Sequence, residues 1–167
     1  MLPAVARVAS AAAKILSLPE LLQRLEPRRA TAERLVLTNG CFELLHLGHI
    51  RYLMAASELG DVLVVGLNSD RSIRRLKEPG RPLVPESQRA EVLAALACVD
   101  FVSLFDELTA ELLVRALRPE VYVKGGDYEG QTPPEAVLAQ SLGGQVKVLE
   151  LVPGCSTTEL VRRIRAT

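Results

Sequence analysis

Apolar positions along the chain follow two periodicities, and these define the elements that the sequence predicts. Short β-branched runs such as residues 61–67 are typical of strands buried on both faces. Segments such as residues 85–96, with apolar residues every three or four positions, are typical of helices with one face against a core. The predicted strands are residues 34–38, 61–67, 99–104, 121–124 and 145–149. The predicted helices are residues 17–27, 48–59, 85–96, 108–117, 134–142 and 157–164.

Strand and helix alternate five times in this order. Such an alternation requires right-handed crossovers and a parallel sheet. The sequence therefore predicts an α/β fold with a Rossmann-like, doubly wound, five-stranded parallel sheet in residues 34–167, preceded by a helical extension in residues 1–33. The helix of this extension starts at Ser17, and Pro27 and the basic residues after it are expected to end that helix.

The first sixteen residues are rich in alanine and carry Arg7 and Lys14 but no acidic residue. This composition is similar to a targeting segment, but the basic residues interrupt the apolar run, and we expect a helix or a frayed tail. A stretch of about 20 apolar residues, which a membrane span needs, does not occur. We expect a cytoplasmic protein without a membrane partner.

Charge and cysteine content narrow the possible partners. The 20 basic and 20 acidic residues cancel, so the overall field gives no reason to expect a nucleic acid as partner, and any anion site must be local. The three cysteines, Cys41, Cys98 and Cys155, are widely and irregularly spaced. This pattern predicts reduced thiols rather than a disulfide framework or a metal site.

The only two histidines, His46 and His49, lie where the first predicted strand passes into a helix. The amides at a helix N-terminus and the helix dipole favour a bound anion, and Gly48 permits close approach of a ligand to the backbone. Their spacing places both rings on one side of the first helical turn, where they can contact a phosphate. Two alternatives are a helix cap beside a surface histidine, and a metal site, which would need ligands other than histidine.

Three further segments follow the ends of other predicted elements. Lys124-Gly-Gly-Asp127 leaves the carboxyl end of a strand, where open α/β sheets bind ligands, although it also fits a simple tight turn. Ser156-Thr-Thr158 starts a helix with hydroxyl groups, which fits triphosphate binding or plain N-capping. The basic residues between Arg71 and Arg81 are, by themselves, most typical of a solvated helix face.

Residues 38–49 (TNGCFELLHLGH) resemble the signature of the cytidylyltransferase-like nucleotidyltransferases, whose H-x-G-H motif binds nucleoside triphosphate. Class I aminoacyl-tRNA synthetases share that motif but are far longer. Four more segments resemble, in the same order, the adenylyltransferases that activate D-glycero-β-D-manno-heptose 1-phosphate with ATP: residues 68–70 (NSD), 76–82 (LKEPGRP), 124–128 (KGGDY) and 154–158 (GCSTT). Such enzymes are often fused to a sugar kinase. Because a chain of 167 residues leaves no room for a kinase domain, it resembles the stand-alone version. Glu43 departs from the family's more frequent aspartate.

The resemblance implies an adenylyltransferase that makes ADP-heptose for a surface glycan, with ATP and a sugar phosphate as partners and Mg²⁺ carried by the ATP phosphates. The implied catalytic residues are His46, His49, Lys77 and Lys124. The implied nucleotide-binding residues are Thr38, Asn39, Gly40, Cys41, Phe42, His46, Gly48, His49, Gly125, Asp127, Ser156, Thr157 and Thr158. The implied substrate-binding residues are Asn68, Asp70, Arg81 and Arg89, of which Arg89 fits surface ion pairing equally well.

Other functions remain open at this point. Within the same class, the sequence also fits a glycerol-3-phosphate or choline-phosphate cytidylyltransferase, or an FMN adenylyltransferase. From a different class, it fits a nucleotide-binding regulatory module without catalysis. Relatives are commonly dimers, and the apolar segment 94–97 or the N-terminal helix is the expected interface of a homodimer.

Overall fold

The computed structural model describes residues 10–126, 132–150 and 152–166. The strands are β1 (Leu35–Gly40), β2 (Val62–Asn68), β3 (Phe101–Phe105), β4 (Val121–Gly125) and β5 (Gln145–Leu149). The helices are η1 (Ala11–Lys14), α1 (Leu18–Ala30), α2 (Leu47–Ser57), α3 (Asp70–Leu76), α4 (Glu86–Ala94), α5 (Glu111–Leu117), α6 (Pro134–Ser141) and α7 (Thr157–Arg165).

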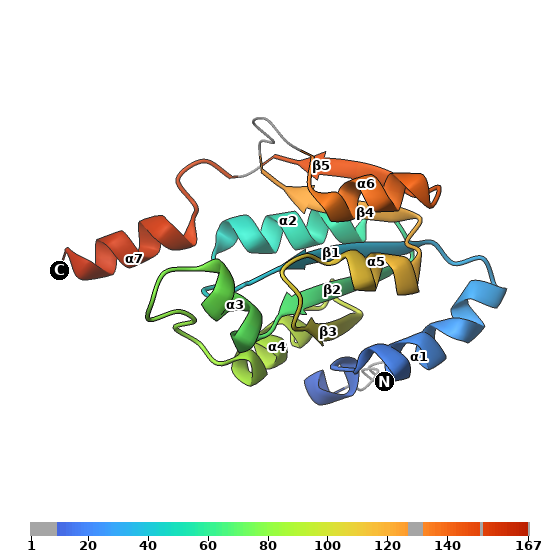
Figure 1. The fold of residues 1–167 in the computed structure, drawn as a ribbon, viewed down its shortest axis with the longest axis horizontal. Coiled ribbons are helices and arrows are strands. Elements are labelled where there is room, and N and C mark those ends of the chain that lie inside the picture. The colour runs from blue at the N-terminus through green and yellow to red at the C-terminus, as the bar shows by residue number, and fades with distance from the viewer. Residues whose placement is uncertain (1–9, 127–131, 151, 167) are drawn as a thin grey trace, which may run out of the picture.

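The five strands form one parallel sheet in the order β3-β2-β1-β4-β5. The chain winds outward from β1 in both directions, which confirms the predicted doubly wound, Rossmann-like fold (Figure 1). In this topology the crossover reverses between β1 and β4, so the carboxyl ends of these two strands flank the usual ligand crevice.

Alternate residues of the strands point into two separate cores. Leu35 and Leu37 of β1 pack with α1, α5 and α6, whereas Val36 packs on the opposite face with α2 and α4. All seven residues of β2 are buried, because helices cover both faces of this strand. The run at 61–67 therefore lacks a polar face for the reason that the sequence indicated.

The N-terminal extension packs directly on the sheet. Leu21 and Leu25 of α1 are buried in the same core as β3 and α5. Ile15 forms a parallel bridge to Val102 in edge strand β3, and the Lys14 ammonium donates to the carbonyl oxygens that follow α4. These contacts cover the sheet edge, which would otherwise leave ladder groups unpaired. The division at residue 33 stays a prediction, and residues 1–9 lie outside the described part of the chain.

Several predicted boundaries were shifted by one to three residues. α1 continues through Pro27 to Ala30, because Pro27 lies in its last turn and the Arg28 carbonyl is capped by the Thr31 and Glu33 amides. α5 begins at Glu111 rather than at 108. Residues 70–76 form the short helix α3, capped by the Ser69 side chain. None of the described helices is both long and apolar enough to cross a bilayer.

Candidate active site

The carboxyl ends of β1 and β4 and the N-termini of α2 and α7 surround a cavity of about 280 Å³. His46 is the N-cap residue of α2, so both histidines stand at the start of that helix. The lining residues are Asn39, Gly40, Cys41, Phe42, His46, Gly48, His49, Tyr52, Lys124, Gly125, Cys155, Ser156 and Thr157. Three motifs that are far apart in the sequence thus meet at the crevice of the sheet.

The two histidine rings stack on each other. Their centroids are 3.9 Å apart with 26° between the planes, and the Phe42 ring lies 5.3 Å from the His49 ring. A Cβ at Gly48 would come within 2.9 Å of the His46 ring and 3.2 Å of the Cys155 Cβ. Position 48 therefore requires glycine for packing, because a side chain there would displace the His46 ring and the start of α7.

Burial keeps both rings uncharged. Removal from water lowers the pKa of His46, and it lowers the pKa of His49 to about 4, with the neighbouring His46 charge as a second cause. The Nδ1 atoms of both rings are buried and have no hydrogen-bond partner of good geometry among the described residues. Both residues line the cavity, where the parts of the rings that are not buried can contact a polar ligand.

The depressed pKa of His49 predicts a pH dependence of stability. The unfolded chain protonates His49 near its ordinary value of 6.5, whereas the folded protein does so near 4. Stability from this group is therefore complete above pH 6.5 and is lost as the pH falls towards 4. We expect the His49→Gln variant to lose less of its melting temperature across this window than the wild type. Melting temperatures that fall by the same amount in both proteins across this pH window would contradict this expectation.

Lys124 is held by a cluster behind the cavity. Its ammonium donates to Asn39 Oδ1 at 3.0 Å and to Glu135 Oε1 at 3.1 Å. The Tyr122 hydroxyl contacts the same two oxygens. β1, β4 and α6 are therefore tied together by four polar side chains, and the ammonium faces the cavity from a fixed position.

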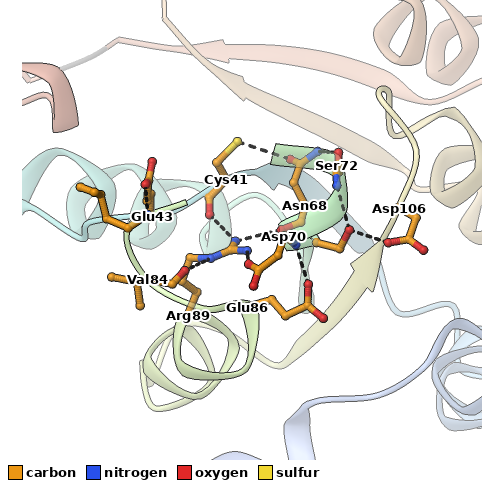
Figure 2. A network of polar contacts seen from close by, with 11 residues as sticks. Cys41, Glu43, Asn68, Asp70, Ser72, Val84, Glu86, Arg89 and Asp106 are labelled. Atoms are coloured by element: carbon orange, nitrogen blue, oxygen red, sulfur yellow. Dashed lines mark hydrogen bonds and ion pairs between the residues drawn. The ribbon is translucent and has the colours of Figure 1, made fainter. Parts of the chain in front are cut away.

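Arg89 does not line the cavity but lies beneath the loops that form it (Figure 2). Its guanidinium donates to the carbonyl oxygens of Cys41, Asn68 and Val84 and pairs with Asp70 at 2.8 Å. The side chain is 1% exposed. Its donors join the ends of β1 and β2 to the start of α3, which differs from the surface ion pair that was the alternative to substrate binding at this position.

Glu43 holds the loop between α3 and α4 against the histidine turn. Its carboxylate pairs with Arg81 at 2.8 Å and accepts a hydrogen bond from the Leu83 amide. Arg81 also pairs with Glu78 at 3.2 Å, whereas Lys77 forms no ion pair with any described residue. Of the two loop cations, Lys77 is thus the one without an ion-pair partner among the described residues.

Lys77 and Arg81 line a second groove, of about 440 Å³, between this loop and α7. Thr158 and Arg162 border it from the helix side. Thr157, one residue earlier, lines the histidine cavity, so the start of α7 separates the two hollows. Ser156 caps α7 by accepting from the Glu159 amide at 3.1 Å while also bordering the cavity, so the N-capping alternative holds for its side chain.

All but one of the predicted site residues fall into four groups. Those that line the cavity are Asn39, Gly40, Cys41, Phe42, His46, Gly48, His49, Lys124, Gly125, Ser156 and Thr157. Lys77, Arg81 and Thr158 lie in the second groove, and Asn68, Asp70 and Arg89 form the network beneath the loops. Thr38 is buried and bonded to the Tyr52 hydroxyl. Asp127 lies outside the described residues.

Sequence reasoning missed four residues at the site. Tyr52 and Cys155 line the cavity, Glu135 accepts a hydrogen bond from Lys124, and Tyr122 donates to Glu135. Tyr52 could have been found, because it lies three residues after His49 on the same helix face. Glu135 carried no local signal, since an acid in a first helical turn is usually an exposed partner of the helix dipole.

Cys41 is a neutral thiol and therefore not a good nucleophile. Burial raises the pKa of Cys41, although the positive charges of Lys77, Arg89 and Lys124 oppose the increase. All three cysteines are free. A neutral thiol is a poor nucleophile, so the residue serves the close packing of the turn.

Comparison with known proteins gives several long matches. The chain is 54% identical over 140 residues to the bifunctional protein HldE of Syntrophotalea carbinolica, covering 84% of this chain and 29% of that protein. It is 51% identical over 153 residues to HldE of Koribacter versatilis, covering 92% of this chain and 32% of that protein. The chain therefore spans about 30% of the length of these curated relatives.

Solved structures share the architecture. A lipopolysaccharide core biosynthesis protein from Thermoplasma volcanium matches with a TM-score of 0.60 and 29% identity, covering 72% of this chain and 97% of that one. Pantothenate synthetase from Thermus thermophilus shares only the fold, with a TM-score of 0.57 and 16% identity over 82% of this chain and 60% of that one. The sequence profile named cytidylyltransferase-like matches residues 37–163. The chain therefore belongs to the cytidylyltransferase-like family and is a nucleotidyltransferase enzyme.

Proposed function

We propose that the protein transfers AMP from ATP to D-glycero-β-D-manno-heptose 1-phosphate, forming ADP-heptose and pyrophosphate. The observation that carries the proposal is the cavity at the switch point of the sheet, which the stacked His46 and His49 line together with Lys124. The choice of ATP and heptose phosphate is supported by the motifs at 68–70, 76–82, 124–128 and 154–158, and by the similarity to HldE and to a lipopolysaccharide core biosynthesis protein.

The proposed reaction is an in-line displacement at the α-phosphorus of ATP. A phosphate oxygen of the sugar phosphate forms the new P–O bond while the bond to the bridging oxygen of the β-phosphate breaks, and pyrophosphate leaves with that electron pair. Because the attacking oxygen is already an anion, no proton has to be removed from it. Positioning and neutralisation of charge therefore carry the catalysis.

The histidines act in this scheme as hydrogen-bond donors. With its pKa lowered to about 4, His49 enters the reaction as a neutral imidazole with one N–H. The stacked geometry disfavours two imidazolium ions side by side, so at most one ring gains charge when the triphosphate binds. Lys124 places its ammonium in the same cavity, and Lys77 contributes its charge from the second groove.

Mg²⁺ is expected to arrive with the nucleotide. Within the described ranges, no three His, Cys, Asp or Glu side chains lie close enough together to hold a metal ion. The ion would be held chiefly by phosphate oxygens and water, as is usual for Mg²⁺ in nucleotide enzymes. When bound, it would neutralise charge on the β- and γ-phosphates, next to the groups that His46, His49 and Lys124 supply.

The substrate assignment is tested by measuring pyrophosphate release. ATP and CTP are each paired with heptose 1-phosphate, glycerol 3-phosphate and FMN, in the presence of Mg²⁺. We expect turnover with ATP and heptose 1-phosphate that exceeds every other pair by at least about 100-fold in kcat/KM, because polar pockets discriminate strongly against ligands that leave buried groups unpaired. Activity with CTP alone would overturn the assignment.

A further inference from the structure

We infer that Glu135 is a positioning residue that sets the reactive position and the effective charge of Lys124. The inference rests on the proposed role of Lys124 at the phosphates and extends it to a residue outside the cavity lining. Glu135 lies in the first turn of α6, is 5% exposed, and directs its carboxylate at the ammonium. It does not line the cavity and so acts only through its neighbours.

The contacts form a closed arrangement of two donors and two acceptors. Lys124 Nζ and the Tyr122 hydroxyl each contact both Glu135 Oε1 and Asn39 Oδ1, at distances from 2.5 to 3.3 Å. Lys124 is thereby bound on its inner side by one charged and one neutral acceptor. Both hydrogen bonds are charge-assisted because the donor is an ammonium, but only the bond to Glu135 joins two opposite charges, so Glu135 supplies the stronger constraint on the ammonium.

The same carboxylate also offsets the positive charge that a triphosphate would meet. The lysine side chain is 22% exposed and the glutamate side chain 7% exposed, so the pair is shielded from bulk water. Attraction between Glu135 and Lys124 then weakens the pull of Lys124 on a ground-state nucleotide. Glu135 thus exchanges some affinity for a fixed position of the cation, and this exchange favours the transition state over the ground state.

Replacement of Glu135 with glutamine separates charge from contact. The hydrogen bonds from Lys124 and Tyr122 both end on Oε1 of Glu135, which the amide oxygen of glutamine can replace, so Glu135→Gln removes the negative charge and keeps the acceptor. We expect ATP to bind about threefold more tightly in calorimetry while kcat falls about tenfold, because the ground state gains attraction and a neutral acceptor holds the lysine less firmly than a carboxylate does. A change that merely loosened the fold would weaken ATP binding and lower the melting temperature.

Glu120→Gln is the matched control. Glu120 accepts a hydrogen bond from the Leu35 amide at 2.8 Å, at the start of β1 and hence at the opposite end of that strand from the cavity. This variant removes the same charge by the same chemical change. We expect ATP affinity and kcat to stay at wild-type values.

A double-mutant cycle tests whether Glu135 acts through Lys124. In a Lys124→Met background, Glu135→Gln is expected to leave kcat unchanged, because the residue it positions is gone. Additive effects on kcat, or a Glu135→Gln variant with wild-type ATP affinity and kcat, would overturn the inference. If the wild type releases no pyrophosphate with any substrate pair, the proposed function fails, and the calorimetric comparison of ATP affinity still tests the role of Glu135.

Discussion

Replacement of His49 with alanine is expected to lower kcat by about 10²–10³, the usual cost of losing one preorganised donor at a developing oxyanion. The ring is held between His46 and Phe42, and burial keeps it neutral. A preorganised donor needs no rearrangement when charge grows on the α-phosphate. We therefore expect the loss to appear in kcat more than in KM, measured as pyrophosphate release at saturating ATP and sugar phosphate.

Met54→Ala is the matched control for this variant. Met54 lies on the same helix, is 51% exposed and does not line the cavity. Met54→Ala therefore shortens a side chain of α2 without removing a hydrogen-bond donor. We expect its kcat to stay within about twofold of the wild type, because exposed substitutions usually change stability by less than 0.5 kcal/mol. A His49→Ala variant that keeps wild-type turnover would contradict the role given to this ring.

The fold was predictable because its signals are local and repeated. The apolar run that became β2 marks a buried strand, whereas β5 at the sheet edge has no buried residue, and the alternation of such strands with helices leaves few parallel topologies. The run at 145–149 coincides with β5 to the residue. Helix ends were less predictable, since they depend on tertiary contacts. The capping of the Arg28 carbonyl, for example, lets α1 continue past Pro27.

The candidate site was predictable where its residues lie in the turns that directly follow the strands. His46, Gly48, Lys124 and Ser156 all border one cavity, as expected from strand ends that meet at one sheet edge. The supporting contacts were not predictable, because they join residues that are distant in sequence. Nothing near Glu135 indicates that its carboxylate meets Lys124, and only the folded loop reveals the partners of Glu43.

Arg89 shows the same limit most clearly. A lone arginine on a predicted amphipathic helix usually points to solvent, and family resemblance placed it near the nucleotide. In the structure its guanidinium contacts three backbone carbonyls and Asp70, all from segments that precede it by five to 48 residues. The contacts of Arg89 therefore depend on how distant loops fold around it, which the spacing of apolar residues in the sequence cannot show.

Replacement of Arg89 with methionine is expected to cost about 3–5 kcal/mol in the free energy of unfolding. The variant keeps an apolar stem of similar length but leaves the Asp70 carboxylate and three carbonyl oxygens without their donor. Removal of one partner of a buried ion pair typically costs this much, because the remaining charge stays desolvated. Asp70 is only partly buried, so water reaching its carboxylate would place the loss at the lower end of the range.

Urea unfolding followed by circular dichroism measures the loss, with Arg51→Met as control. Arg51 is an exposed residue of α2 with no ion pair among the described residues, so the same substitution there should change stability by less than about 0.5 kcal/mol. Arg89→Lys should recover only part of the loss, since an ammonium cannot reproduce the planar fork that reaches four acceptors. If Arg89→Met has the same free energy of unfolding as Arg51→Met but binds ATP weakly, the guanidinium belongs to the nucleotide site and does not support the loops.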